Sequence, residues 1–201
     1  MAPRIEASDE LAPIYSAEED EQLARNLAAL LTEIHQGLHR RHPLTLAYLC
    51  EIHAKLFEGV RTHGGRYRTH GRGSETLVFG PNRSVHREQV ERELEAVLRQ
   101  AQDSILSVEA NPDDPDRDRS ALHIAVWTHA ELVRIHPFED GNGRTSRNVM
   151  SSILVRLGLR PIAVEECKQT YCDCLNEYFR SRNLKPLLHL MLRLMAEQLA
   201  D

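Results

Sequence analysis

HPFEDGNGRTSR, residues 136–147, separates two helical patterns in a chain of 201 residues. The apolar residues before it recur at helical spacing from about residue 120, and Pro137 ends that pattern because the residue before a proline resists α geometry. After it, apolar residues from Met150 to Leu157 continue at helical spacing until Gly158. The twelve residues are therefore expected to form a loop that opens a second helix.

The loop has the composition of an anion site. Gly141 and Gly143 let backbone N–H groups turn toward one point, and the helix start adds donors that lack intrahelical partners. Arg144 and Arg147 lie in the first turn, where the helix dipole disfavours each cation by about 0.3–1 kcal/mol. Their spacing of three points both side chains the same way. A bound polyphosphate explains this pair better than helix stability does.

Three further loop residues are candidates for chemistry or support. His136 ends the preceding helix nearly in phase with its apolar stripe, so it is either a core-edge histidine satisfied by a carbonyl or, beside a polyphosphate, a general base of pKa about 6.5. Asp140 would repel phosphate unless a cation intervenes, which indicates Mg²⁺, although it could also cap the helix. Phe138 is expected to point into the core and anchor the loop, whereas Pro137 and Glu139 face outward.

The rest of the chain predicts an all-α fold with one hairpin. Ser16 and Glu19 form a capping box that starts a first helix. Further helices are expected at about 45–57, 90–105, 120–136 and 144–157, and two more between residues 167 and 195. A glycine-rich break precedes the only expected β structure, a hairpin at about 74–86. Residues 16–201 are expected to form one compact domain behind a mobile leader, residues 1–15.

Composition excludes several classes of protein. The net charge of -5 and the pI of about 6.1 argue against sequence-independent binding of nucleic acid. No stretch resembles a secretory signal or reaches the length of a membrane span, so neither a membrane nor a nucleic acid is expected as a partner and the location is expected to be cytoplasmic. The four cysteines fit buried, reduced thiols better than disulfides or a metal site: Cys50, Cys167, Cys172 and Cys174.

At residues 136–147 the sequence resembles the signature of the Fic family, His-x-Phe-x-(Asp or Glu)-Gly-Asn-Gly-x-x-x-Arg, at every fixed position. The similarity extends from GGRYRT, which begins at Gly64, through the helix after Leu184. It implies a helical Fic-type domain that transfers AMP from ATP to a Ser, Thr or Tyr hydroxyl of a target protein. It also implies a base, His136; a Mg²⁺ ligand, Asp140; a phosphate cradle, Gly141, Asn142 and Gly143; and two arginines that bind the leaving pyrophosphate, Arg144 and Arg147.

The resemblance assigns the expected hairpin to a flap that pairs with an extended stretch of the target, through Thr76, Leu77, Val78 and Phe79. A hairpin packed on the core is an equal alternative. Some members of the family transfer phosphate or phosphocholine, or remove AMP. The phosphate-transferring branch carries Ala and Lys in its version of the GNGR segment, and the intact Gly143-Arg144 favours AMP transfer. A catalytically silent domain that senses nucleotide is the alternative from another class.

Regulation is left open by the sequence. Many Fic proteins are inhibited by a helix with (Ser or Thr)-x-x-x-Glu-(Gly or Asn), whose glutamate pairs with the second arginine of the signature. The nearest match, Ser84 to Glu88, is followed by Gln89 and lies at the exit of the flap. The chain is therefore expected either to be inhibited by a separate protein or to lack this kind of control. A homodimer is possible. The acidic residues at 18–21 are interpreted as a solvated first turn rather than a substitute carboxylate.

Overall fold

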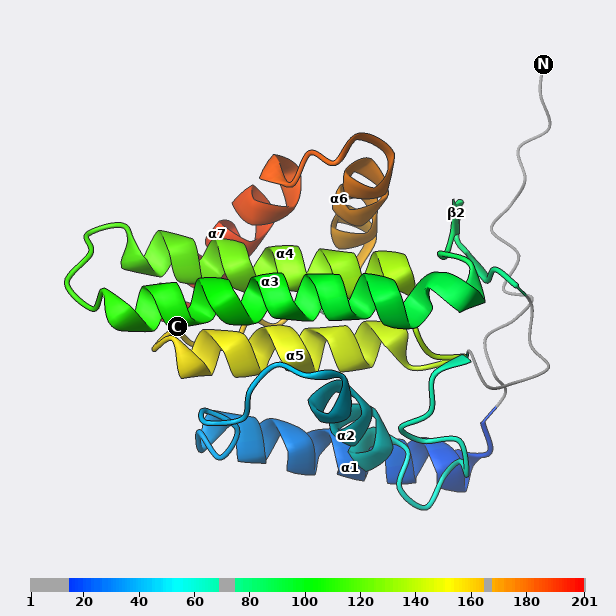
Figure 1. The fold of residues 1–201 in the computed structure, drawn as a ribbon. Coiled ribbons are helices and arrows are strands. Elements are labelled where there is room, and N and C mark those ends of the chain that lie inside the picture. Colours follow the sequence, from blue (N-terminus) through cyan, green and yellow to red (C-terminus); the bar gives the residue numbers. More distant parts are fainter. Residues whose placement is uncertain (1–14, 69–74, 165–167, 201) are drawn as a thin grey trace.

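Helix α5, which opens with the glycine-rich loop, lies in the middle of the molecule (Figure 1). The computed structural model describes residues 15–68, 75–164 and 168–200. The α-helices in this part of the chain are α1 (Ala17–His35), α2 (Leu46–Leu56), α3 (Val90–Ala110), α4 (Arg117–Ile135), α5 (Asn142–Arg156), α6 (Lys168–Ser181) and α7 (Lys185–Ala200). A hairpin of β1 (Val78–Phe79) and β2 (Asn82–Arg83) and a 3-10 turn, η2 (Arg87–Gln89), precede α3.

The helices pack in layers around α5. Helices α3 and α4 lie on one side of it, α1 and α2 lie on the other, and α6 and α7 pack against the outer side of α4 (Figure 1). The facing sides of α4 and α5 supply fully buried residues such as Ile135 and Met150 to one continuous core. The loop between α4 and α5 therefore stands on two rigid helices, which fixes the position of residues 136–141.

Local signals set the start of α1 and form the hairpin as predicted. The Ser16 hydroxyl accepts from the Glu19 N–H at 3.2 Å, and the Glu19 carboxylate accepts from the Ser16 N–H at 2.8 Å, which completes the capping box. In the hairpin, Val78 pairs with Arg83 and Phe79 with Asn82, and the turn places Gly80 at φ 53. Helix α4 begins at Arg117, three residues before the expected start at Ser120. The predicted all-α fold with one small hairpin is confirmed.

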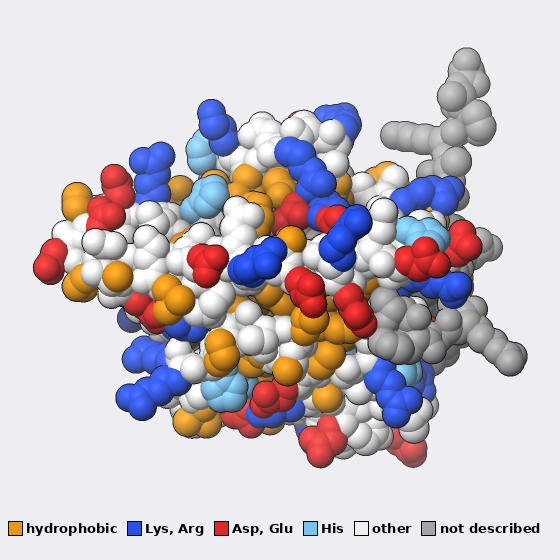
Figure 2. All heavy atoms as spheres, in the orientation of Figure 1, with side chains coloured by type: hydrophobic (Ala, Val, Ile, Leu, Met, Phe, Trp, Pro, Cys, Tyr) orange, Lys and Arg blue, Asp and Glu red, His pale blue; other side chains and the backbone are white. Residues whose placement is uncertain are grey.

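Some predictions fall on parts of the chain that are not described. Residues 1–14 of the expected leader, Ser74 of the hairpin, and Cys167 lie outside the described residues. Cys50, Cys172 and Cys174 are half-buried, rather than fully buried as expected. No helix among residues 15–68, 75–164 and 168–200 has both the length and the apolar character of a membrane span. On the face in Figure 2, acidic and basic side chains are interspersed, in keeping with a small net charge.

Candidate active site

His136 lies at the C-terminal end of α4, in a left-handed conformation with φ 54. This conformation costs a residue other than glycine about 1–2 kcal/mol, so the surroundings must hold it in place. Its Nδ1 lies 3.2 Å from the Val133 carbonyl oxygen, which can only accept, so Nδ1 carries the proton and Nε2 is an acceptor. Burial, opposed by the bond to Val133 and aided by the charge of Arg68, lowers the pKa of His136 to about 4. The imidazole is therefore neutral at pH 7 and can take up a proton at Nε2.

The loop after His136 is anchored by its aromatic residue. Phe138 is fully buried, as expected, and its ring stacks on His53 at a centroid distance of 3.7 Å. Its backbone N–H donates to Asn142 Oδ1 at 2.9 Å, and its carbonyl accepts from Asn142 Nδ2 at 2.8 Å. The Asn142 side chain is thus committed to the loop, which leaves only its backbone N–H to bind a phosphate. Pro137 is buried, so the expectation that it faces outward is wrong, whereas Glu139 is exposed.

Gly141 makes the close approach between this loop and α2 possible. It adopts φ 71, and a Cβ built on it would lie 2.5 Å from Phe57 Cε2. His53, also on α2, bonds through Nε2 to the Asp140 carbonyl oxygen at 3.1 Å, while its Nδ1 accepts from the Gly65 N–H at 2.8 Å. Burial lowers the pKa of His53 to about 4, which keeps it neutral in this role. The loop is therefore tied to α2 by residues more than 80 positions away in sequence.

The start of α5 presents free donors and two cations. Gly141 is the N-cap, no side chain caps the helix among the residues described, and the first backbone N–H groups belong to residues 142–144. A Cβ at Gly143 would lie 3.3 Å from Arg147 Nη1, so this guanidinium sits at the helix start. Arg144 reaches Asp140 Oδ2 at 3.3 Å. Arg144 and Arg147 also line a cavity of about 350 Å³ between α1, α5 and residues 161–163.

Asp140 does not cap α5; its partly exposed carboxylate pairs with Arg144 instead. In the described part of the chain, no group of three or more His, Cys, Asp or Glu residues could hold a metal ion by itself. Within the same ranges no acidic residue forms an ion pair with Arg147. Glu88, of the nearest sequence match to an inhibitory motif, pairs with His86, and Glu19 of the acidic helix start pairs with Arg61.

The hairpin closes over the histidine with one face and exposes the other. Phe79 stacks on the His136 ring with a centroid distance of 4.1 Å and an angle of 13°. Its neighbour Val78 is 59% exposed. One face of the strand therefore packs on the domain, and the opposite face is available to a target, so the two alternatives for this hairpin are compatible. Thr76 and Leu77 are half-buried, and the Leu77 N–H donates to Ser84 Oγ at 2.8 Å.

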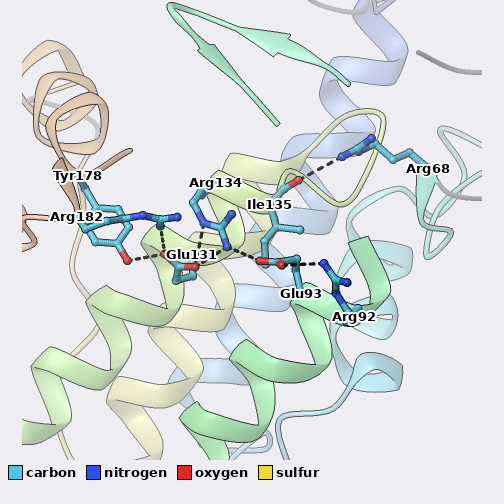
Figure 3. Close-up of polar contacts among 8 residues, drawn as sticks. All are labelled: Arg68, Arg92, Glu93, Glu131, Arg134, Ile135, Tyr178 and Arg182. Atoms are coloured by element: carbon cyan, nitrogen blue, oxygen red, sulfur yellow. Dashed lines mark hydrogen bonds and ion pairs between the residues drawn. The ribbon is translucent and has the colours of Figure 1, made fainter. Parts of the chain in front are cut away.

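The structure adds a polar network around the buried Glu131, five residues before His136 (Figure 3). Glu131 of α4 accepts from the Tyr178 hydroxyl, from Arg182 Nη1 at 2.6 Å and from Arg134 Nη2 at 2.8 Å, and Arg134 also reaches Glu93 of α3 at 3.0 Å. The network joins α4 to α3, α6 and the segment before α7. No sequence pattern marked these residues, because their partners come from four separate elements.

The sequence matches members of one family. Residues 43–154 match the family described as the Fic/DOC family. A protein adenylyltransferase Fic of Nematostella vectensis is 31% identical over 145 residues, which cover 70% of this chain and 30% of that protein. One of Drosophila grimshawi is 29% identical over 148 residues, covering 73% of this chain and 27% of that protein. The chain spans less than a third of the length of these relatives.

Solved structures share the fold at lower identity. A Fic domain-containing signalling protein of Bacteroides thetaiotaomicron superposes with a TM-score of 0.73 at 19% identity, covering 96% of this chain and 75% of that one. The BepC protein of Bartonella tribocorum, solved with bound AMPPNP, gives a TM-score of 0.64 at 18% identity and covers 88% of this chain and 86% of that one. The helical arrangement around α5 is thus common to these proteins.

Proposed function

The chain belongs to the Fic/DOC family, and we propose that it is a protein adenylyltransferase that moves AMP from ATP onto a Ser, Thr or Tyr hydroxyl of a target protein. The observation that carries this proposal is a neutral histidine with an acceptor Nε2 beside a helix start that offers free N–H donors and two arginines. A base and a polyphosphate site next to each other are what transfer to a hydroxyl requires. The curated relatives named protein adenylyltransferase Fic support the same activity.

The proposed reaction uses His136 as the base. Its Nε2 takes the proton of the target hydroxyl while the hydroxyl oxygen forms a bond to the α-phosphorus of ATP. The bond between the α-phosphorus and the bridging oxygen to the β-phosphate then breaks, and pyrophosphate leaves with that electron pair. Because the imidazole is neutral down to about pH 4, no prior deprotonation is needed at pH 7.

The phosphates are assigned to the start of α5. The backbone N–H groups of residues 142–144 would bind the α-phosphate, and Arg144 and Arg147 would bind the charge of the leaving pyrophosphate. Asp140 fits a Mg²⁺ site, because Mg²⁺ in proteins is commonly held by one or two carboxylates together with phosphate oxygens and water. Asp140 would be the protein ligand, with Arg144 moving from it to the phosphates. Mg²⁺ bound there would neutralise charge on the phosphates.

The hairpin is assigned to target docking. Strand β1 pairs only with β2 among the residues described, and Val78 is exposed, so an extended segment of the target could add to the free edge. Main-chain pairing of this kind would place a hydroxyl near His136 without requiring a particular target sequence. The target is therefore expected to present its Ser, Thr or Tyr in an extended, accessible segment.

The test is AMP transfer by purified protein. Incubation with Mg²⁺ and ATP labelled at the α-phosphate should label the protein itself or a protein in a lysate, and His136→Ala should abolish the label. His123→Ala, an exposed histidine on the same helix, is the control and should retain it. Intact-mass analysis of the product would distinguish AMP from phosphate or phosphocholine. Absence of label with folded wild-type protein would refute the proposal, and ATP binding without transfer would instead support a nucleotide sensor.

A further inference from the structure

Arg68 is a buried arginine that lies between the end of α4 and the base of the hairpin. Only 3% of its surface is exposed. Its Nε donates to the His136 carbonyl at 2.8 Å. Its Nη2 donates to the Ile135 carbonyl at 3.4 Å (Figure 3). Its backbone N–H donates to the Pro137 carbonyl at 3.0 Å. Arg68 therefore contacts three consecutive residues at the point where the chain turns from α4 into the loop.

The same guanidinium holds both arms of the hairpin. Nη1 donates to the Glu75 carbonyl at 3.2 Å, and Nη2 donates to the Val85 carbonyl. Glu75 precedes β1 and Val85 follows β2, so the two residues belong to the two arms of the hairpin. The arms are also joined by the Arg87 N–H, which donates to the Glu75 carbonyl at 2.8 Å. One side chain thus joins the base of the hairpin to the backbone of His136.

The geometry requires an arginine. A guanidinium presents five N–H donors in a rigid plane, which allows it to bond several carbonyl oxygens that surround it. A lysine ammonium is a compact charge at the end of a flexible stem and cannot span the same set. In the ranges that the structure describes, Arg68 forms no ion pair with a carboxylate, and its acceptors are carbonyl oxygens. The end of α4 also carries the negative pole of the helix dipole, which favours a cation there.

We propose that Arg68 is a positioning residue that holds the hairpin and the backbone of His136 in one arrangement, so that a hydroxyl docked on the hairpin meets the base. The inference rests on the proposed function, in which His136 is the base and the hairpin docks the target. The acceptors of the Arg68 side chain are carbonyls at the end of α4 and in the hairpin arms, not groups at the start of α5, whose donors and arginines would bind the phosphates. Loss of the guanidinium should therefore impair transfer while ATP binding persists.

The test compares Arg68→Lys with Arg66→Lys, the same substitution at an exposed residue two positions away. For R68K, the rate of AMP transfer at saturating ATP should fall about 10- to 100-fold, as expected when a reacting group is displaced by about 1 Å. The KM and the calorimetric Kd for ATP should stay within about twofold of wild type, because the substitution removes no proposed contact with the nucleotide. Hydrogen exchange of residues 75–87 should accelerate. R66K should match wild type in all three measurements.

The outcomes separate this inference from the function on which it rests. Unchanged transfer in R68K, or a loss of ATP affinity equal to the loss of transfer, would overturn the positioning role. Should R68K not fold, R68Q is measured in its place, and failure of both to fold would assign Arg68 to the fold instead and overturn the proposal. Should wild-type protein transfer nothing, the proposed function fails, and the exchange of residues 75–87 still decides whether Arg68 joins hairpin and helix.

Discussion

Replacing Gly141 by alanine should destabilise the protein through two separable effects. The backbone there has φ 71, which costs an alanine about 1–2 kcal/mol. The new Cβ would also lie 2.5 Å from Phe57 Cε2 and 2.8 Å from its Cζ. Phe57 is fully buried and cannot swing aside without disturbing the core, so overpacking adds about 1–3 kcal/mol. The expected loss in the free energy of unfolding is about 2–5 kcal/mol.

Gly80 supplies a matched control. It has φ 53, yet a Cβ built on it meets nothing within 4 Å. Gly80→Ala should therefore carry the conformational cost of about 1–2 kcal/mol without the steric one. Both substitutions stiffen the unfolded chain to a similar extent, so that contribution cancels in the comparison. The difference between the two variants, about 1–3 kcal/mol, isolates the contact between the loop and Phe57.

Urea unfolding followed by circular dichroism measures this difference, with calorimetric titration of ATP as the second readout. Gly141→Ala should also weaken ATP binding, because the loop that opens α5 must move away from α2, whereas Gly80→Ala should bind ATP normally. Each kcal/mol corresponds to a melting temperature about 2–4 °C lower in a chain of this size. If Gly141→Ala unfolds at the same urea concentration as Gly80→Ala, the reasoning from the Phe57 contact is wrong.

Three further predictions concern buried polar groups. Asn142→Ala leaves the N–H and carbonyl of Phe138 without partners and should cost about 1–3 kcal/mol in urea unfolding. His53, with a folded pKa of about 4 below its ordinary 6.5, makes stability fall as pH drops between these values; His53→Gln should flatten this slope by up to about 1.4 kcal/mol per pH unit. Glu131→Gln should lower the melting temperature more than Glu93→Gln, whose carboxylate is more exposed.

The features that the sequence predicted are those carried by local patterns. The capping box at Ser16, the helix stop at Pro137 and the helix start after Gly141 each depend on neighbours within a few residues, and the structure reproduces them. The outward orientation expected for Pro137 is wrong, because it too was inferred from a local pattern, the alternation of side chains. Alternation describes an extended strand, whereas His136 turns the chain into a left-handed conformation, and the side chains that follow no longer alternate between core and solvent.

The residues that support the site from a distance left no comparable trace. Arg68 and His53 act mainly on backbone carbonyls, at His136 and Asp140 respectively. A carbonyl belongs to every residue, so the identity of the acceptor carries no information about its donor, and periodicity reports only that a helix face is buried. Burial of a guanidinium costs free energy unless several acceptors surround it. Helix ends and hairpin arms are where unpaired carbonyls occur, so they are the places to look for the partners of a buried arginine. The end of α4 and the base of the hairpin together supply those acceptors, which is why loss of this one side chain should disturb both at once.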